Sequence, residues 1–326
     1  NRTKTRVRAF SLQYNAHQIQ RFIQRGGNRV AGIGFELKRL FHKKGVLNTI
    51  SAESYVSVRK AHHAVYRLCK IDVEYQYSPV FIGLEKGQTV IVHTSLSSLG
   101  FVCGGAQIVI EALLETVGPE GTIVMPTQSW KNLDPSTGVH WEEPEEWHDI
   151  IRQNWPAYNK DITPTNTMGA VAEMFRKWPG TLRSNHPARS IAAWGKHAQL
   201  ITENHDLSNI FGEGSPLSKI YDLNGNVLLI GVGYDKNTSI HLADVRANYP
   251  SKHNCTEHSA IMENGNRVWK AYETLFVDGE DFEEIGKAFE ENCSVNKTKL
   301  GNGILTFMKQ QELVDFSVKW IEENRK

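Results

Sequence analysis

The alternation of apolar runs from Gly87 onward most constrains the fold of this chain. Short apolar runs alternate with longer amphipathic segments, a pattern typical of β-α units around a largely parallel sheet. The predicted strands are residues 89–93, 122–126 and 226–232, and the predicted helices are residues 108–117, 240–246 and 312–323. The helix between the first two strands implies a right-handed crossover. We therefore predict an α/β fold with a largely parallel central sheet flanked by helices.

The beginning of the chain differs in composition from the rest. In residues 1–52, Lys and Arg recur while Glu36 is the only acid. This basic extension fits a disordered or weakly packed tail, a targeting or membrane-surface segment, or a partner-binding element. Apolar residues at helical intervals between residues 52 and 71 indicate an amphipathic helix. We assign residues 53–83 to a helical leader and residues 84–326 to the main domain.

Overall composition excludes several classes of protein. A net charge of +1 with 22% charged residues argues against a nucleic-acid binder. No apolar run approaches the ~18 residues that span a bilayer, so no membrane segment is expected. The cysteines are scattered, which favours reduced thiols and a cytoplasmic location. Cys103 is best interpreted as a small buried residue. The histidines show no metal-binding spacing, so no metal is expected, and His197, His205, His253 and His258 are interpreted as surface residues.

A hydroxyl-rich turn follows the first predicted strand. Its residues are Thr94, Ser95, Leu96, Ser97 and Ser98, and glycines follow at positions 100, 104 and 105. In open α/β sheets, ligands bind outside the carboxyl ends of the strands, where backbone N–H groups are free. Such a turn suits a pyrophosphate or the amides of a pantetheine arm. The alternative is a polar turn that only caps the next helix.

Two histidines have surroundings that suit acid–base chemistry. His241 and Asp244 are three residues apart at a predicted helix start, so they share one face and the carboxylate can orient the imidazole. The alternative is an ordinary surface pair in which Asp244 complements the helix dipole. His186 precedes Pro187 in a polar loop that suits the wall of a site, although a lone loop histidine is more often structural.

An acidic segment between Asp134 and Asp149 includes Glu142, Glu143 and Glu145, interleaved with tryptophans. Carboxylates would attract a polycationic substrate, and indoles would stack on sugars or cations. A solvated acidic loop is the alternative. We select Asp134, Glu142, Glu143 and Glu145 as candidate substrate contacts.

Four segments in order resemble the aminoglycoside 3-N-acetyltransferase family. They are Thr89 to Gly105, Ser184-Asn-His-Pro187, Gly231-Val-Gly-Tyr-Asp235 and Ser239-Ile-His-Leu-Ala-Asp244. The resemblance implies an α/β fold particular to the family and transfer of an acetyl group from acetyl-CoA to the 3-amino group of a 2-deoxystreptamine ring. It implies that a histidine backed by a carboxylate deprotonates the amine, which attacks the thioester directly. The family commonly has glutamate where this chain has Asp244.

The resemblance yields a set of site residues. His186 and His241 are the catalytic candidates with Asp244 as the orienting carboxylate, and which histidine is the base stays open. The turn residues 94–98, Thr127 and Arg189 are the candidate coenzyme contacts. The expected partners are acetyl-CoA and an aminoglycoside or another amine. Three alternatives remain: an acyltransferase for a different amine, a non-catalytic CoA- or nucleotide-binding module, and a hydrolase.

Overall fold

The computed structural model describes residues 82–137 and 140–326. The basic extension 1–52 and the leader 53–83, apart from its last two residues, therefore lie outside the described residues. In the part of the chain that is described, no helix combines the length and apolar character needed to cross a membrane.

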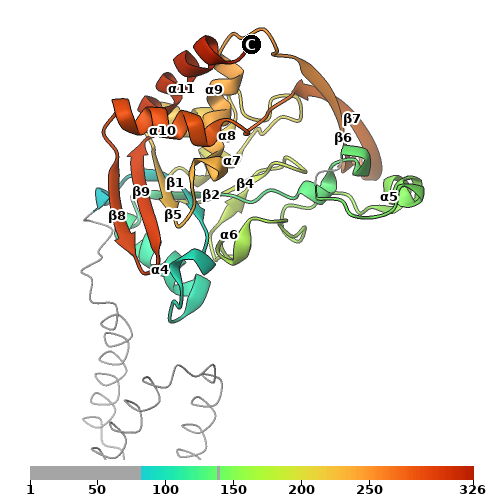
Figure 1. The fold of residues 1–326 in the computed structure, drawn as a ribbon. Coiled ribbons are helices and arrows are strands. Elements are labelled where there is room, and N and C mark those ends of the chain that lie inside the picture. The colour runs from blue at the N-terminus through green and yellow to red at the C-terminus, as the bar shows by residue number, and fades with distance from the viewer. Residues whose placement is uncertain (1–81, 138–139) are drawn as a thin grey trace, which may run out of the picture. The chain divides into compact units, whose positions relative to one another are not determined.

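A seven-stranded sheet forms the centre of the fold, in the order β3-β4-β2-β1-β5-β9-β8 (Figure 1). The strands are β1 (Thr89–Thr94), β2 (Thr122–Pro126), β3 (Leu182–Arg183), β4 (Ile191–Gly195), β5 (Asn226–Ile230), β8 (Asn296–Leu300) and β9 (Gly303–Lys309). The three predicted strands are β2, β1 and β5, and they lie side by side and parallel. The outer strands on both sides pair antiparallel. The predicted α/β fold is confirmed, with the parallel pairing at the centre of the sheet.

Helices cover both faces of this sheet (Figure 1). They are α4 (Gly105–Val117), α6 (Gly169–Phe175), α7 (Ala198–Thr202), α8 (Pro216–Asp222), α9 (His241–Arg246), α10 (Phe282–Asn292) and α11 (Gln310–Asn324). Helices α4 and α6 pack on one face and the others on the opposite face. The predicted helices correspond to α4, α9 and α11.

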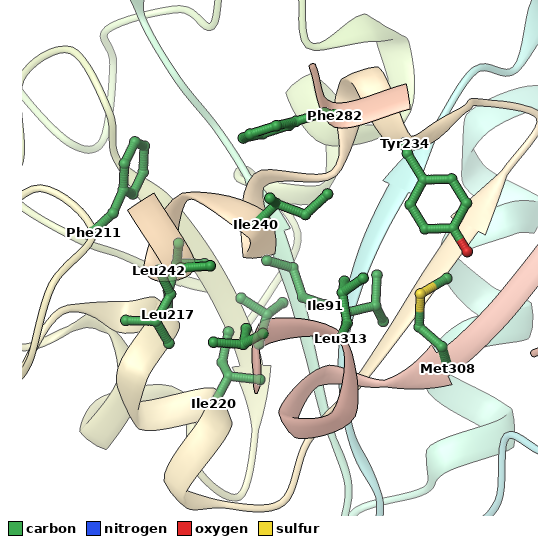
Figure 2. Packing of buried hydrophobic residues seen from close by; sticks show 14 of the residues in the cluster. Ile91, Phe211, Leu217, Ile220, Tyr234, Ile240, Leu242, Phe282, Met308 and Leu313 are labelled. Atoms are coloured by element: carbon green, nitrogen blue, oxygen red, sulfur yellow. The ribbon is translucent and has the colours of Figure 1, made fainter. Parts of the chain in front are cut away.

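The alternation of side chains along β1 explains why the sheet needs cover on both faces. Val90 and Val92 join the hydrophobic cluster of α4 and α6, whereas Ile91 joins the cluster of α8, α9 and α11. Figure 2 shows the second cluster, in which Ile91 lies among side chains that include Ile240 and Leu313. Burial on both faces requires a continuous apolar run, which is the pattern the sequence shows.

A separate hairpin, β6 (Asn254–Glu263) with β7 (Asn266–Leu275), projects from the main sheet (Figure 1). The short helix α5 (His148–Asn154) lies beside it. The Arg267 guanidinium donates to the Trp155 carbonyl at 2.7 Å, and the Tyr158 N–H donates to the Ala260 carbonyl at 2.8 Å. These bonds attach the hairpin to the segment that follows α5.

Candidate active site

The hydroxyl-rich turn at residues 94–98, called the serine turn from here on, meets the chain leaving β5 at one edge of the sheet. Since β1 and β5 are parallel neighbours, their carboxyl ends lie together, and the Ser95 N–H donates to the Ile230 carbonyl at 2.9 Å. Gly231 has φ +66°, and a Cβ there would lie 2.9 Å from the Cβ of Ser98. Glycine is therefore needed at Gly231 both for the backbone turn and for close packing against the serine turn.

The same exit from β5 leads to α9, which begins with His241. Asn237 accepts a hydrogen bond from the Ser239 N–H at 3.2 Å and caps the turn before this helix. His241 Nδ1 lies 2.7 Å from Asp244 Oδ2, so the predicted contact across three helical positions is confirmed. The Asp244 side chain is fully buried, whereas the His241 side chain is 17% exposed. Because an ionised carboxylate only accepts, Nδ1–H is the donor of this hydrogen bond, and in the neutral ring Nε2 keeps its lone pair.

Two aromatic rings hold the imidazole of His241. Phe211 stacks on it with a centroid distance of 4.7 Å and an interplanar angle of 4°. Phe282 approaches it at 4.7 Å and 58°. Figure 2 shows both phenylalanines at the side of the hydrophobic cluster that contains Ile240 and Leu242. The imidazole is thus fixed in plane and direction, with Asp244 at one nitrogen.

The second oxygen of Asp244 is bound by an arginine from a distant part of the chain. Arg325 Nη1 donates to Asp244 Oδ1 at 2.6 Å. The remaining nitrogens of the same guanidinium, Nε and Nη2, donate to Asp281 at 2.6 and 2.7 Å. Arg325 and Asp281 are not among the site residues that the sequence predicts. Neither residue has a local signal, because Arg325 is 81 residues from Asp244 in the chain.

His93, at the end of β1, was also missed, because it lies within a buried apolar run. Burial, and then the nearby His241, lower the pKa of His93 to about 3, so the ring is neutral at physiological pH. Its Nε2 is buried without a hydrogen-bond partner among the described residues. The interaction with His241 places His93 on the β1 side of the same site.

The structure places His186 in a different environment from His241. Its ring is fully buried, and Nδ1 accepts N–H bonds from Ala188 at 3.2 Å and Arg189 at 3.0 Å. Burial lowers the pKa of His186 well below its usual value, with further contributions from His205 and Arg189. The neighbouring rings are His205 at 4.9 Å and Tyr272 at 6.0 Å.

His205 itself corrects the prediction of a surface residue. It is buried, with Ser184 Oγ 2.9 Å from Nδ1 and the Ile210 carbonyl 2.8 Å from Nε2. Both ring nitrogens are satisfied inside the protein, which is how a polar ring is accommodated in a core. Cys103 is a second correction, since it is exposed where a buried residue was expected.

The candidate coenzyme contacts fall into two groups. Ser97 and Ser98 are exposed, and the Ser98 hydroxyl donates to Ser95 Oγ at 2.7 Å. Thr127 is buried, and its hydroxyl donates to the Ser190 carbonyl at 3.2 Å. Arg189 makes two bonds of 2.7 Å to Glu257 in a buried ion pair. The turn therefore offers accessible polar groups, whereas the Thr127 hydroxyl and the two terminal nitrogens of Arg189 are engaged by the protein.

The candidate substrate contacts in the acidic segment also divide into residues bonded within the protein and residues that are exposed. Asp134 accepts from Arg152 at 2.9 and 3.0 Å, and although burial opposes ionisation, these bonds and those from Ser136 hold the pKa of Asp134 well below its usual range. Glu143 binds Lys131 at 2.8 Å, and this hydrogen bond lowers the pKa of Glu143. Glu142 and Glu145 are exposed. Two carboxylates thus hold the loop together and two face solvent.

A cavity of about 410 Å³ lies beside α9. Its lining includes Phe211, Val245 and Lys252, together with Glu273 and Thr274 of β7. Phe211 also stacks on His241, so the cavity is next to the histidine–carboxylate pair. Within residues 82–137 and 140–326, no three His, Cys, Asp or Glu side chains are grouped closely enough to hold a metal ion.

Fold and site together define an α/β enzyme with a histidine–carboxylate pair and a polar turn at one sheet edge. Residues 91–322 match the family model described as aminoglycoside 3-N-acetyltransferase, and the chain belongs to this family. The resemblance noted in the sequence is thereby confirmed.

Several known proteins are similar to this chain in sequence or in structure over the main domain. The SPbeta prophage-derived aminoglycoside N(3')-acetyltransferase-like protein YokD of Bacillus subtilis (strain 168) is 46% identical, covering 74% of this chain and 89% of its own length. The crystal structure of YokD superposes with a TM-score of 0.71, at 45% identity, covering 76% and 97% of the two chains. Aminoglycoside N(3)-acetyltransferase IX of Micromonospora chalcea is 32% identical, covering 75% of this chain and 91% of its own length. A structure described as AAC-IIIb binary with CoASH has a TM-score of 0.67 at 26% identity, covering 76% and 94%.

Proposed function

We propose that this protein transfers an acetyl group from acetyl-CoA to the 3-amino group of a 2-deoxystreptamine aminoglycoside, with His241 as the general base. The observation that carries the proposal is the His241–Asp244 pair beside the serine turn, in a chain of this family. The CoASH complex of AAC-IIIb supports the choice of donor.

The geometry suits direct transfer. Nε2 of His241 accepts a proton from the acceptor ammonium, while Asp244 holds Nδ1–H and stabilises the imidazolium. The free amine attacks the thioester carbonyl, the C–N bond forms and the C–S bond breaks. CoA leaves as a thiolate, which takes up the proton that the attacking nitrogen loses as it becomes an amide. The hydroxyls of Thr94, Ser95, Ser97 and Ser98 would hold the pantetheine arm and stabilise the oxyanion.

His241 suits the role of base better than His186. A general base must reach the substrate proton, and the His241 side chain is partly exposed. The His186 ring is buried, and Nδ1 already accepts two backbone bonds. We assign to His186 the role of ordering the loop that carries Arg189. Arg189 and Thr127 would then support the coenzyme side through the protein.

The acceptor is a polycation, and the acidic segment supplies complementary charge. Glu142 and Glu145 are exposed and available to ammonium groups. Asp134 and Glu143 would act with Arg152 and Lys131 to shape the loop. A cytoplasmic location is part of the proposal, because it supplies acetyl-CoA and keeps Cys103, Cys255 and Cys293 as free thiols.

The test is release of CoA thiol on mixing the protein with acetyl-CoA and a panel of aminoglycosides, with acetylation at N3 identified by NMR of the product. His241→Ala should lower kcat by roughly 10²-fold to 10⁴-fold. His186→Ala should cost stability, with a smaller loss of kcat per folded molecule. Thiol release without an amine would indicate hydrolysis. Coenzyme binding without turnover across the panel would indicate a binding module, and either result would overturn the proposal.

A further inference from the structure

We propose that Arg325 is a positioning residue that fixes the Asp244 carboxylate and, together with its second partner Asp281, sets how strongly His241 binds a proton. The inference rests on the proposed role of His241 as the base. Arg325 lies beyond residue 322, where the match to the family model ends.

Three charged side chains from separate elements meet here. Asp244 belongs to α9, Asp281 immediately precedes α10, and Arg325 immediately follows α11. Arg325 donates once to Asp244 and twice to Asp281, all at 2.6 to 2.7 Å. Its guanidinium also lies 5.3 Å from the centroid of the Tyr249 ring. One cation thus holds two carboxylates, and the cluster carries a net charge of −1.

This arrangement determines where the Asp244 carboxylate points. Helix α9 has only six residues, too few to be rigid without external contacts. Of the two Asp244 oxygens, one accepts from Arg325 and the other from His241. The next residue after Asp281 is Phe282, whose ring contacts His241. The Arg325 guanidinium therefore holds both the Asp244 carboxylate and Asp281, which precedes the Phe282 ring that contacts the imidazole.

The charges around His241 give the cluster a second effect. The groups that face the imidazole are His93 from β1, which is neutral, and Asp244, whose charge is offset by Arg325 and supplemented by Asp281. Removing the guanidinium leaves two uncompensated carboxylates, so His241 should hold its proton to higher pH. Removing the Asp281 charge should have the opposite effect, because Arg325 then offsets Asp244 alone.

The test is the pH profile of kcat/KM for acetyl transfer, with an NMR titration of His241 measured in parallel. Arg325→Gln should lower kcat roughly tenfold to a hundredfold and move the ascending limb up by about one pH unit. Asp281→Asn should move the limb down. The double variant restores the net charge of −1 and should bring the limb back while kcat stays low. The control is Arg246→Gln, in the same helix as Asp244. It removes the ion pair between Arg246 and Glu213 and should leave the ascending limb unchanged.

These outcomes separate positioning from simple structural support. A loss of folded protein alone would lower kcat without moving the limb, and an unmoved limb in both single variants would overturn the inference. If Arg325→Gln does not fold, the direction of the shift in Asp281→Asn decides. If the wild-type protein shows no amine-dependent thiol release, the proposed function fails, while the NMR titration midpoints of His241 still test Arg325.

Discussion

At the scale of single residues, the described histidines differ through their hydrogen bonds. His186 and His205 are buried and bonded within the protein, and burial lowers the pKa of both, that of His205 to about 4. His241 is partly exposed and is hydrogen-bonded to Asp244. Solvent access and a buried carboxylate together support the proposal that this imidazole accepts the substrate proton.

Replacing the carboxylate should test that assignment. Asp244→Asn removes the charge that stabilises the imidazolium, so kcat should fall by roughly 10²-fold to 10⁴-fold, with the pH profile moved to lower pH. Steady-state thiol release measures both effects. Asp244→Glu keeps the charge and is the matched control, which should retain more activity than the asparagine variant. Equal activity of asparagine variant and wild type would contradict a role for the charge.

At the scale of elements, the packing of one loop on another forms the proposed coenzyme side of the site. The serine turn after β1 lies so close to the exit of β5 that a Cβ added at Gly231 would be 2.9 Å from the Ser98 Cβ and 3.2 Å from the Ser95 carbonyl oxygen. No side chain fits between these loops. The position of the turn therefore depends on the glycine that follows the neighbouring strand.

A methyl group at Gly231 should push the serine turn away. We expect Gly231→Ala to raise KM for acetyl-CoA roughly tenfold, the equivalent of about 1.4 kcal/mol, and to change KM for the aminoglycoside less. Gly118→Ala is a matched control, since Gly118 has φ +65° and open space around a Cβ. Both variants should lose about 1–2 kcal/mol of stability from backbone strain. Equal KM values for acetyl-CoA in the two variants would show that the contact does not position the turn.

At the scale of the whole molecule, buried neutral histidines should make the fold sensitive to mild acid. The unfolded chain gains protons on His93, His186 and His205 near pH 6.5, whereas the folded chain resists until the pH nears 3 for His93 and 4 for His205. Stability is therefore complete above pH 6.5 and falls as the pH drops through this window. Each histidine changes the free energy of unfolding by up to about 1.4 kcal/mol per pH unit in this window.

Urea unfolding between pH 7.5 and 5.0 measures this effect. The free energy of unfolding should decrease towards pH 5.0, by up to roughly 2 kcal/mol for each of the three histidines. In His205→Gln the free energy of unfolding should depend less steeply on pH, because about one proton fewer is taken up on unfolding. This holds whatever the stability of the variant at pH 7.5. A free energy of unfolding that stays constant over this range would contradict the lowered pKa values of the buried rings.

The sequence predicts those parts of the molecule in which local pattern and tertiary environment agree. Strand β1 is a run of apolar residues because both of its faces are buried, and His241 meets Asp244 because they are one helical turn apart. The outer antiparallel strands have weaker patterns, and β8, at the edge of the sheet, has four polar residues in succession. Arg325 and Asp281 could not be found locally, because their bonds are formed only by the packing of α9, α10 and α11.

The place of β5 in the sheet has a consequence for synthesis on the ribosome. It pairs with β1, which is made earlier, and with β9, which begins only at Gly303. The bonds from Arg325 to Asp244 come later still. A nascent chain that has emerged only as far as α9 already carries His241, yet it lacks one neighbour of β5 and the cation that holds the carboxylate. The pair can reach its final geometry only after residue 325 has left the exit tunnel.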